Sequence, residues 1–151
     1  MKQQDLHKFI GIPYKFLGTD FDGCDCIGLC QLFMRSHGID ITWRDGRPIR
    51  KDWYLTEPFR LARWLCTYFN KVPSIDALQY GDIVLFEING ESHTGIYVGN
   101  AKVLTILEVF KTSMIMHLKK QNVFYQCGKC ANNIYYIIIS IHLFRKVSIC
   151  T

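Results

Sequence analysis

The most regular pattern of apolar and polar positions in the chain follows Asp25. Apolar side chains recur there three and four residues apart, which is the spacing that places them on one face of a helix. The positions that carry this pattern are Cys26, Leu29, Cys30, Phe33, Met34 and His37. Asp25 is suited to cap the first turn and Gly38 to stop the last one. The pattern therefore predicts a helix over residues 26–37 that begins at a cysteine.

A second helical pattern covers residues 57–69, "EPFRLARWLCTYF". Pro58 stands in its first turn, where a helix accommodates proline well. The apolar positions at helical spacing are Phe59, Ala62, Leu65, Cys66 and Phe69. Glycines interrupt residues 1–25, so a short helix or turn followed by a loop is expected there. Residues 39–56 are basic and are predicted to be irregular.

Strand-like segments dominate the chain after Pro73. The predicted strands cover residues 82–88, 93–99, 103–109, 113–118 and 135–147. The segment "NGES" (89–92) contains Asn-Gly, which is typical of a tight hairpin turn. Helices that come first and an antiparallel sheet that follows indicate an α+β fold.

The size of the chain suits one domain over residues 1–151. Its 49% hydrophobic and 21% charged residues are ordinary for a globular protein. The N-terminal residues show no apolar run of the kind found in a signal peptide, and the longest apolar run, "IYYIII" (134–139), is too short to span a bilayer. We therefore expect no membrane span, and a cytoplasmic or virion-associated protein.

The formal net charge is +5, and six Lys or Arg residues fall between residues 44 and 63. A basic surface can attract nucleic acid, but these residues lack the interleaved aromatic side chains of a single-strand binding motif. We interpret this segment as a solvated face of mixed charge, without a nucleic-acid partner.

Seven cysteines are present, and without an export signal we expect them to be reduced. Cys24 and Cys26 are too close in sequence to form a disulfide without strain. The "CGKC" segment (127–130) has metal-site spacing, but no second such pair accompanies it, so we interpret it as a turn and predict no metal site. Cys66 is expected in the core, and Cys150 as a thiol in the tail.

The candidate chemistry starts at Cys26. A helix N-terminus favours an anion, so a thiol there can have a lowered pKa and act as a nucleophile. The plainer alternative is a small buried hydrophobe. A nucleophilic cysteine needs a base, and His93 is the best candidate because it opens a strand directly after the hairpin. His117 is its main competitor.

Three segments together resemble the NlpC-type cysteine peptidases, which cut peptides of the bacterial cell wall. The first, "GIPYKFLGTDFDGCDCIGL" (11–29), is similar to the Gly-x-Pro-Tyr and Asp-Cys-x-Gly-Leu motifs of the family. The second, "LQYGDIVLFEI" (78–88), is similar to its Pro-Gly-Asp-Leu-Val-Phe-Phe strand. The third, "HTGIYVGNAKVL" (93–104), is similar to its His-x-Gly-Ile-Tyr-x-Gly strand. The resemblance runs from about residue 8 to residue 110. Within the family, "GCDC" followed by an aliphatic residue and "GL" looks most like the small members found in phage tails.

The resemblance implies a papain-like core, in which N-terminal helices pack on a C-terminal antiparallel sheet with the nucleophile at a helix N-terminus. It implies that Cys26 is the nucleophile and His93 the general base. Tyr14 and Asp25 match motif residues that bind substrate or hold the nucleophile loop. The implied reaction is hydrolysis of amide bonds in peptidoglycan stem peptides through an acyl-enzyme, which needs no cofactor and no metal. The implied partners are this peptide substrate and, for the phage subtype, tail proteins.

Two positions depart from the family pattern. Thr105 stands where most members have a His that orients the catalytic imidazole, so we expect Thr105 as the third catalytic residue, with a water or His117 as alternatives. Ile27 stands where many members have a Ser that contributes to substrate recognition. These departures keep two other functions open: an inactive or weakly active binding module, as in a phage tail, and a related acyltransferase or amidase.

Overall fold

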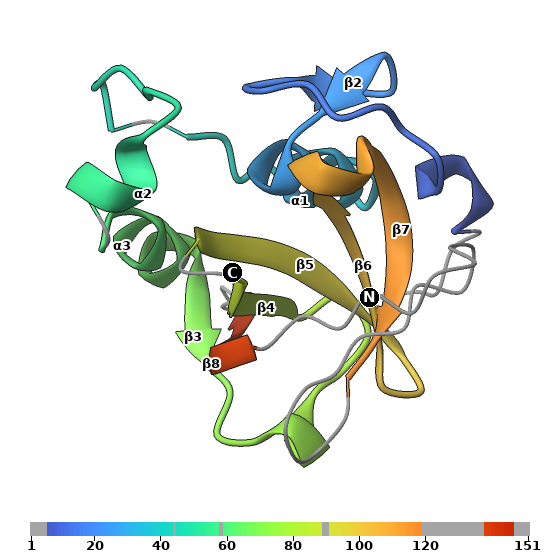
Figure 1. Ribbon diagram of the computed structural model, residues 1–151. Coiled ribbons are helices and arrows are strands. Elements are labelled where there is room, and N and C mark those ends of the chain that lie inside the picture. The colour runs from blue at the N-terminus through green and yellow to red at the C-terminus, as the bar shows by residue number, and fades with distance from the viewer. Residues whose placement is uncertain (1–5, 44, 58, 89–90, 119–137, 147–151) are drawn as a thin grey trace.

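The computed structural model describes residues 6–43, 45–57, 59–88, 91–118 and 138–146, and within them the fold is α+β (Figure 1). The helices are α1 (Cys26–Ser36), α2 (Trp53–Thr56) and α3 (Arg60–Tyr68). The strands are β1 (Thr19–Asp20), β2 (Gly23–Cys24), β3 (Phe69–Lys71), β4 (Ile83–Ile88), β5 (Glu91–Gly99), β6 (Lys102–Leu107), β7 (Thr112–His117) and β8 (Ile138–Lys146). Short 3₁₀ turns cover His7–Phe9, Ile75–Ala77 and Glu108–Phe110.

Helix α1 forms where the sequence pattern predicts it. Its Asp25 cap accepts a hydrogen bond from the backbone N–H of Gly28, and Gly38 after its end has a positive φ of 74°, which suits glycine. The helix ends at Ser36, one residue before the predicted limit. It packs against β5 and β6, so its first turn lies over the sheet.

Helix α3 differs from its predicted form in the face that it buries. Its buried apolar side chains are Leu61, Trp64 and Leu65, whereas Cys66 is exposed and Phe59 is 72% exposed. The prediction of a core position for Cys66 was therefore wrong. The reason is that the buried guanidinium of Arg60 and the indole of Trp64 occupy the inner face. The segment before it was predicted to be irregular, but it contains the short helix α2.

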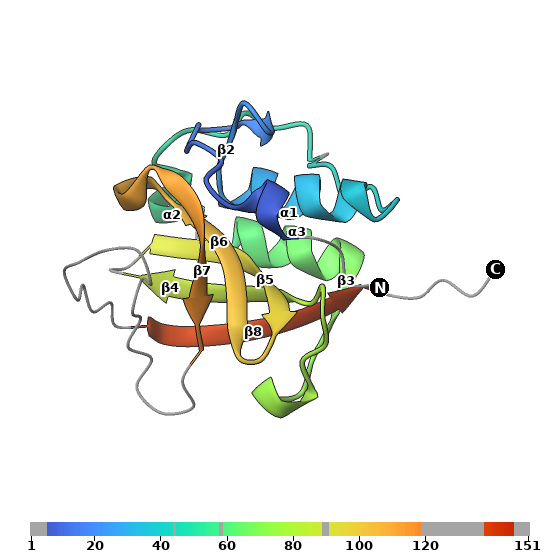
Figure 2. The same ribbon diagram turned by 90° about the vertical axis from the view of Figure 1, so that its right-hand side faces the viewer.

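A six-stranded antiparallel sheet in the order β3-β8-β4-β5-β6-β7 carries the helices on one face. Figure 2 shows α1 and α3 on the same side of the sheet, and β6 and β7 running steeply across β4, β5 and β8. The predicted antiparallel sheet and the helices-first arrangement are confirmed. The strand β3 was not predicted, because its three residues follow α3 without a break. Residues 89–90 of the predicted hairpin turn lie outside the described residues.

The central strand β4 is buried on both faces, which explains its nearly continuous apolar sequence. Ile83 and Leu85 join the core between the sheet and the helices, whereas Val84, Phe86 and Ile88 join a second cluster on the opposite face. The second cluster is completed by side chains from β6, β7 and the segment around Leu78. The sheet is thus fixed from both sides.

Two glycines allow the loop before α1 to lie directly on the helix. A Cβ on Gly28 would come within 1.8 Å of the carbonyl oxygen of Gly18, and a Cβ on Gly18 would come within 2.2 Å of that of Gly23. No side chain fits at either position. The close approach explains the Gly-rich motif, and it places the Asp25–Cys26 corner beside β5.

Candidate active site

Cys26 and His93 line one cavity of about 260 Å³ between the first turn of α1 and the start of β5, which we call the active cavity. Tyr14 and Asp25 line it too. Four of the five residues predicted for the site are therefore brought together. Three of them come from residues 14–26, and the fourth is His93. Thr105 is fully buried and is not among the lining residues. The remaining lining residues are Phe16, Ile27, Lys51, Trp53, Glu91, Ser92, Ile106 and Glu108.

Asp25 fixes the loop that carries the nucleophile. One carboxylate oxygen accepts from the backbone N–H of Gly28 at 2.7 Å, and the other accepts from that of Leu17 at 2.9 Å. The first bond satisfies an N–H that the helix cannot pair, and the second ties the preceding loop to the same point. Burial raises the pKa of Asp25, against the effect of these hydrogen bonds.

Two threonines connect Cys26 to the sheet. The hydroxyl of Thr94 donates to the backbone carbonyl of Cys26 at 3.0 Å, and the hydroxyl of Thr105 donates to the backbone carbonyl of Thr94 at 2.8 Å. Both threonine side chains are fully buried. Thr105 thus lies on β6 opposite Gly95 of β5, and its described hydrogen bond fixes the strand that carries His93.

His93 lies in a mostly apolar setting. Its side chain is 14% exposed, and its ring stacks on Phe86, the residue opposite it on β4, at 6.1 Å between ring centroids. Burial lowers the pKa of His93 to about 4. The carboxylate of Glu91 lies 3.6 Å from Nε2 and favours the imidazolium, so it opposes the effect of burial. At neutral pH the imidazole is therefore uncharged and able to accept a proton.

The pKa of Cys26 contradicts the expectation from helix position. Burial and, to a smaller extent, the carboxylate of Asp25 raise the pKa of Cys26 to about 11, although hydrogen bonds from Thr94 act in the opposite direction. The prediction of a lowered pKa for this thiol was wrong. The reason is that removal of the thiolate from water outweighs the field of the helix. The site instead holds a neutral thiol and a neutral imidazole.

Tyr14 closes the cavity on the side of β7. Its backbone forms a bridge to Cys24, and its N–H donates to the carbonyl of Lys111 at 2.9 Å. Burial and the neighbouring carboxylate of Glu108 raise the pKa of the phenol well above its usual range. The phenol is therefore protonated at neutral pH and can donate a hydrogen bond.

His117 lies at the other end of the sheet from the active cavity. It pairs with Lys102 at the start of β6, whereas the register of β5 and β6 places His93 near the end of β6 at Leu107. The two ends of this strand are about 17 Å apart. His117 therefore lies too far from His93 to orient its imidazole.

Several lining residues were not predicted from the sequence. Glu91 had a signal, because side chains two apart on a strand share a face and Glu91 precedes His93 by two residues. Lys51 and Trp53 had none, since only tertiary packing brings their loop to the cavity. Within the described residues, no group of three or more His, Cys, Asp or Glu side chains is arranged to hold a metal ion. The predicted "CGKC" turn lies outside those residues.

None of the helices that the structure describes has the length and apolar character needed to cross a bilayer. No curated protein matches the chain. The model of the NlpC/P60 family matches residues 11–126, which is well over half of the sequence and includes every residue that lines the active cavity. Together with a cysteine at a helix N-terminus facing a histidine on an antiparallel sheet, this match shows that the chain belongs to the NlpC/P60 family, whose members are generally cysteine hydrolases of cell-wall peptidoglycan.

Proposed function

We propose that the protein hydrolyses an amide bond in peptidoglycan stem peptides, with Cys26 as the nucleophile and His93 as the general base. The observation that carries this proposal is the shared cavity, in which the sulfur at the start of α1 and the imidazole at the start of β5 face the same space. Family membership supports the same chemistry. The single domain expected over residues 1–151 stays a prediction.

Acylation starts from a neutral thiol and a neutral imidazole. The sulfur of Cys26 attacks the substrate carbonyl carbon while its proton moves to His93, so the thiolate never has to exist alone in the buried cavity. The oxyanion that forms is suited to accept hydrogen bonds from the Tyr14 phenol and from backbone N–H groups in the first turn of α1. When the intermediate collapses, the C–N bond breaks and His93 returns its proton to the leaving amine.

Deacylation reverses these roles with water. His93 takes a proton from a water molecule, the oxygen attacks the thioester carbonyl, and the C–S bond breaks. The sulfur of Cys26 recovers the proton from His93, and the peptide leaves with a new carboxyl group. Atoms and protons balance without any cofactor or metal.

Two residues are candidates for the third catalytic group, which orients His93 or stabilises its charged form. The expected role of Thr105 in orienting His93 stays a prediction, and its hydroxyl is also bonded to the Thr94 carbonyl. Glu91 is the charged group at Nε2 of His93. We propose that Glu91 stabilises the imidazolium formed during acylation, and that Thr105 acts through Thr94 to hold the backbone of Cys26.

Digestion of purified peptidoglycan tests the function. The chain and its Cys26→Ser variant are incubated with it, and the released fragments are identified by mass. We expect peptide fragments with new amino and carboxyl ends from the original chain, and a loss of at least about 10³-fold for the variant. Equal release by both proteins would refute the role of Cys26.

A second function, that of a peptide-binding module, is favoured by one observation. The raised pKa of Cys26 and the lowered pKa of His93 are those of a buried resting pair rather than of an activated one. Such a module, for example in a phage tail, would bind stem peptide with or without Cys26 and release no product. The same digestion separates the two functions, and an added amine acceptor reveals acyl transfer as a coupled product.

A further inference from the structure

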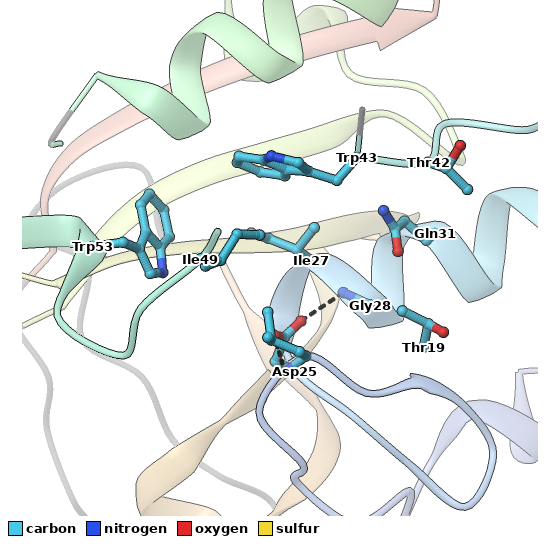
Figure 3. Close-up of a pocket in the computed structure, with 10 residues that line it drawn as sticks. Thr19, Asp25, Ile27, Gly28, Gln31, Thr42, Trp43, Ile49 and Trp53 are labelled. Carbon is cyan, nitrogen blue, oxygen red and sulfur yellow. Dashed lines mark hydrogen bonds between the residues drawn. The ribbon is translucent and has the colours of Figure 1, made fainter. Parts of the chain in front are cut away.

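A second cavity of about 270 Å³ adjoins the active cavity and has no role in the mechanism above. The two cavities share Asp25, Ile27 and Trp53 in their walls. Figure 3 shows the second one bounded by Trp43 above Ile27, by Trp53 and Ile49 at one end and by Gln31 at the other. We call it the Gln31 pocket. Its position means that a substrate bound at Cys26 can extend into it.

The amide of Gln31 is the feature that indicates a ligand. The residue is only 7% exposed, yet no hydrogen bond of its side chain is present among the described residues. In Figure 3 the amide points into the space between Trp43 and Ile27. The amide atoms stay accessible from the pocket, so they can exchange water for a bound molecule there. The amide offers one acceptor oxygen and two donor N–H groups to a bound molecule.

The walls of the pocket are held in place before any ligand binds. Trp43 stacks on Trp64 of α3 at 5.2 Å between centroids with 20° between the ring planes, and the guanidinium of Arg60 lies 5.3 Å from the same ring. Trp53 contacts the Trp43 ring edge-on at 6.3 Å. A rigid aromatic wall favours flat groups with C–H or apolar faces, because little side-chain freedom is lost when they bind.

The charge of the lining selects against acidic ligands. Asp25 is the charged residue in the wall, and the other polar groups are the Gln31 amide and the hydroxyls of Thr19 and Thr42. No Lys, Arg or His belongs to the lining that the structure describes. A carboxylate or phosphate would therefore enter without a positive partner and near a carboxylate.

We infer that the Gln31 pocket is a specificity site for an uncharged amide group of the substrate, which pairs with the Gln31 side chain while its C–H face lies against Trp43. This inference rests on the proposed function, because it takes the active cavity next to the pocket as the place of cleavage. The same chemistry has two sources in peptidoglycan: the acetamido group of an N-acetylated sugar, and an amide of the peptide.

Binding to an inactive variant tests the inference directly. The side-chain NH₂ signals of Gln31 are followed by NMR in ¹⁵N-labelled Cys26→Ala protein. The probes are an N-acetylglucosamine trimer and two stem peptides that differ only in a terminal carboxamide or carboxylate. We expect one amide-bearing probe to shift the Gln31 signals, and the carboxylate peptide to bind at least about ten-fold more weakly than its carboxamide twin if the peptide is the source. The responding probe identifies the source.

Gln31→Met in the same background is the matched control, because methionine has a similar length and keeps the packing without the amide. It is expected to remove the preference for the amide probe. Gln31→Glu keeps a polar group and is expected to reject the same probe, so the test does not depend on one variant folding. Unmoved Gln31 signals at saturating concentrations of every probe, or equal binding of the carboxamide and carboxylate peptides together with no response to the sugar, would overturn the inference.

The experiment separates this inference from the proposed function. Binding is measured without turnover, so hydrolysis by the original chain with silent Gln31 signals refutes only the specificity site. A clear response of Gln31 in a protein that releases no product refutes only the proposed hydrolysis.

Discussion

At the scale of single residues, burial decides the protonation state of the proposed catalytic pair. The rise in the pKa of Cys26 from 9.0 to about 11 corresponds to about 3 kcal/mol against the thiolate. A helix N-terminus contributes typically about 0.3–1 kcal/mol in favour of an anion. The larger effect wins, so the sulfur becomes nucleophilic only as its proton moves to His93.

This balance predicts how Cys26 reacts with an alkylating agent. The pKa of Cys26 is about 11. At about pH 7 such a thiol is ionised to only about one part in 10⁴, so labelling of Cys26 is expected to be slow. Its rate should rise about ten-fold per pH unit through about pH 10. Mass analysis resolves Cys26 from the other cysteines, and the Cys26→Ala variant gives the background. A rate that levels off near neutral pH would instead indicate a thiolate–imidazolium pair.

His93 predicts a loss of stability in mild acid. Its pKa is about 4 in the folded chain and about 6.5 in an unfolded one. Between these values the unfolded state binds more protons, so stability falls as the pH decreases from about 6.5 to about 4, by up to about 3 kcal/mol. Above this window His93 has no effect.

Urea unfolding across that pH range measures the effect, with His93→Gln as the comparison. The variant is expected to lose less stability on acidification than the original chain. The same dependence of the free energy of unfolding on pH in both proteins would show that the imidazole titrates as it does in water.

Glu91 and Thr105 predict different kinetic effects. Glu91→Gln removes the charge at Nε2 of His93 and is expected to lower kcat by about ten-fold, with little effect on stability because Glu91 is about half exposed. Thr105→Val removes a buried hydrogen bond to Thr94 and should destabilise the fold by about 1 kcal/mol or more. Rates against pH and urea unfolding of both variants check this. A larger kcat loss from Thr105→Val at unchanged stability would restore its expected role beside the imidazole.

Most of the candidate residues could be predicted at this scale because local sequence specifies them. Asp25 and Cys26 follow from a cap and a helix start, and His93 from the strand after a hairpin. The pKa values could not be predicted, because they depend on how far the packed sheet removes water from each group. Gln31 gave no signal as a ligand group, since its spacing is only that of a helical residue.

At the scale of elements, the loop between α1 and α3 is held by one buried guanidinium. Arg60 is 2% exposed and makes a two-bond contact with Asp45 at 2.7 and 2.8 Å. It also contacts Glu57 and donates to the carbonyls of Arg47 and Pro48. The guanidinium holds the pKa of Asp45 well below its usual range. The basic segment that we expected to be a solvated face thus contains an internal anchor.

Replacement of this anchor should loosen the loop. Arg60→Met keeps the apolar stem but leaves Asp45 and two carbonyls without their donor, so we expect a loss of about 2–4 kcal/mol in the free energy of unfolding. Arg50→Met is the matched control, because the Arg50–Asp52 pair is exposed and screened by water, so its loss should have little effect. Urea denaturation of both variants checks this. Equal losses in the free energy of unfolding would show that the buried contacts of Arg60 stabilise the fold no more than the exposed Arg50–Asp52 pair does.

The element boundaries show where pattern analysis works and where it does not. Helix α1 carries both a cap and a stop, and its limits were predicted to within one residue. Helix α3 has Arg60 and Trp64 on its inner face. When every charged residue is expected at the surface, the wrong face of such a helix is predicted to be buried. Only the ion pairs with a distant loop make the burial of Arg60 favourable.

At the scale of the whole molecule, the α+β architecture followed from the order of periodicities, with helical spacing first and strands later. The curvature of the sheet and the position of the 39–57 segment beside α1 did not, because they depend on long-range packing. That segment supplies Trp43 and Trp53 to the Gln31 pocket and Lys51 to the active cavity. The motif thus predicted the reacting groups, whereas the surroundings that select a substrate required the structure.

The most direct measurement of the central claim is the site of acylation by an activated ester of the stem-peptide acyl group. Such esters acylate quickly, so the acyl-enzyme accumulates before water attacks it. After an acid quench, peptide mapping by mass is expected to find one acyl group per chain, on the partly buried Cys26 and not on the exposed Cys66, with acylation slowed in His93→Gln. An adduct distributed among the exposed cysteines, or the same rate without His93, would contradict the account.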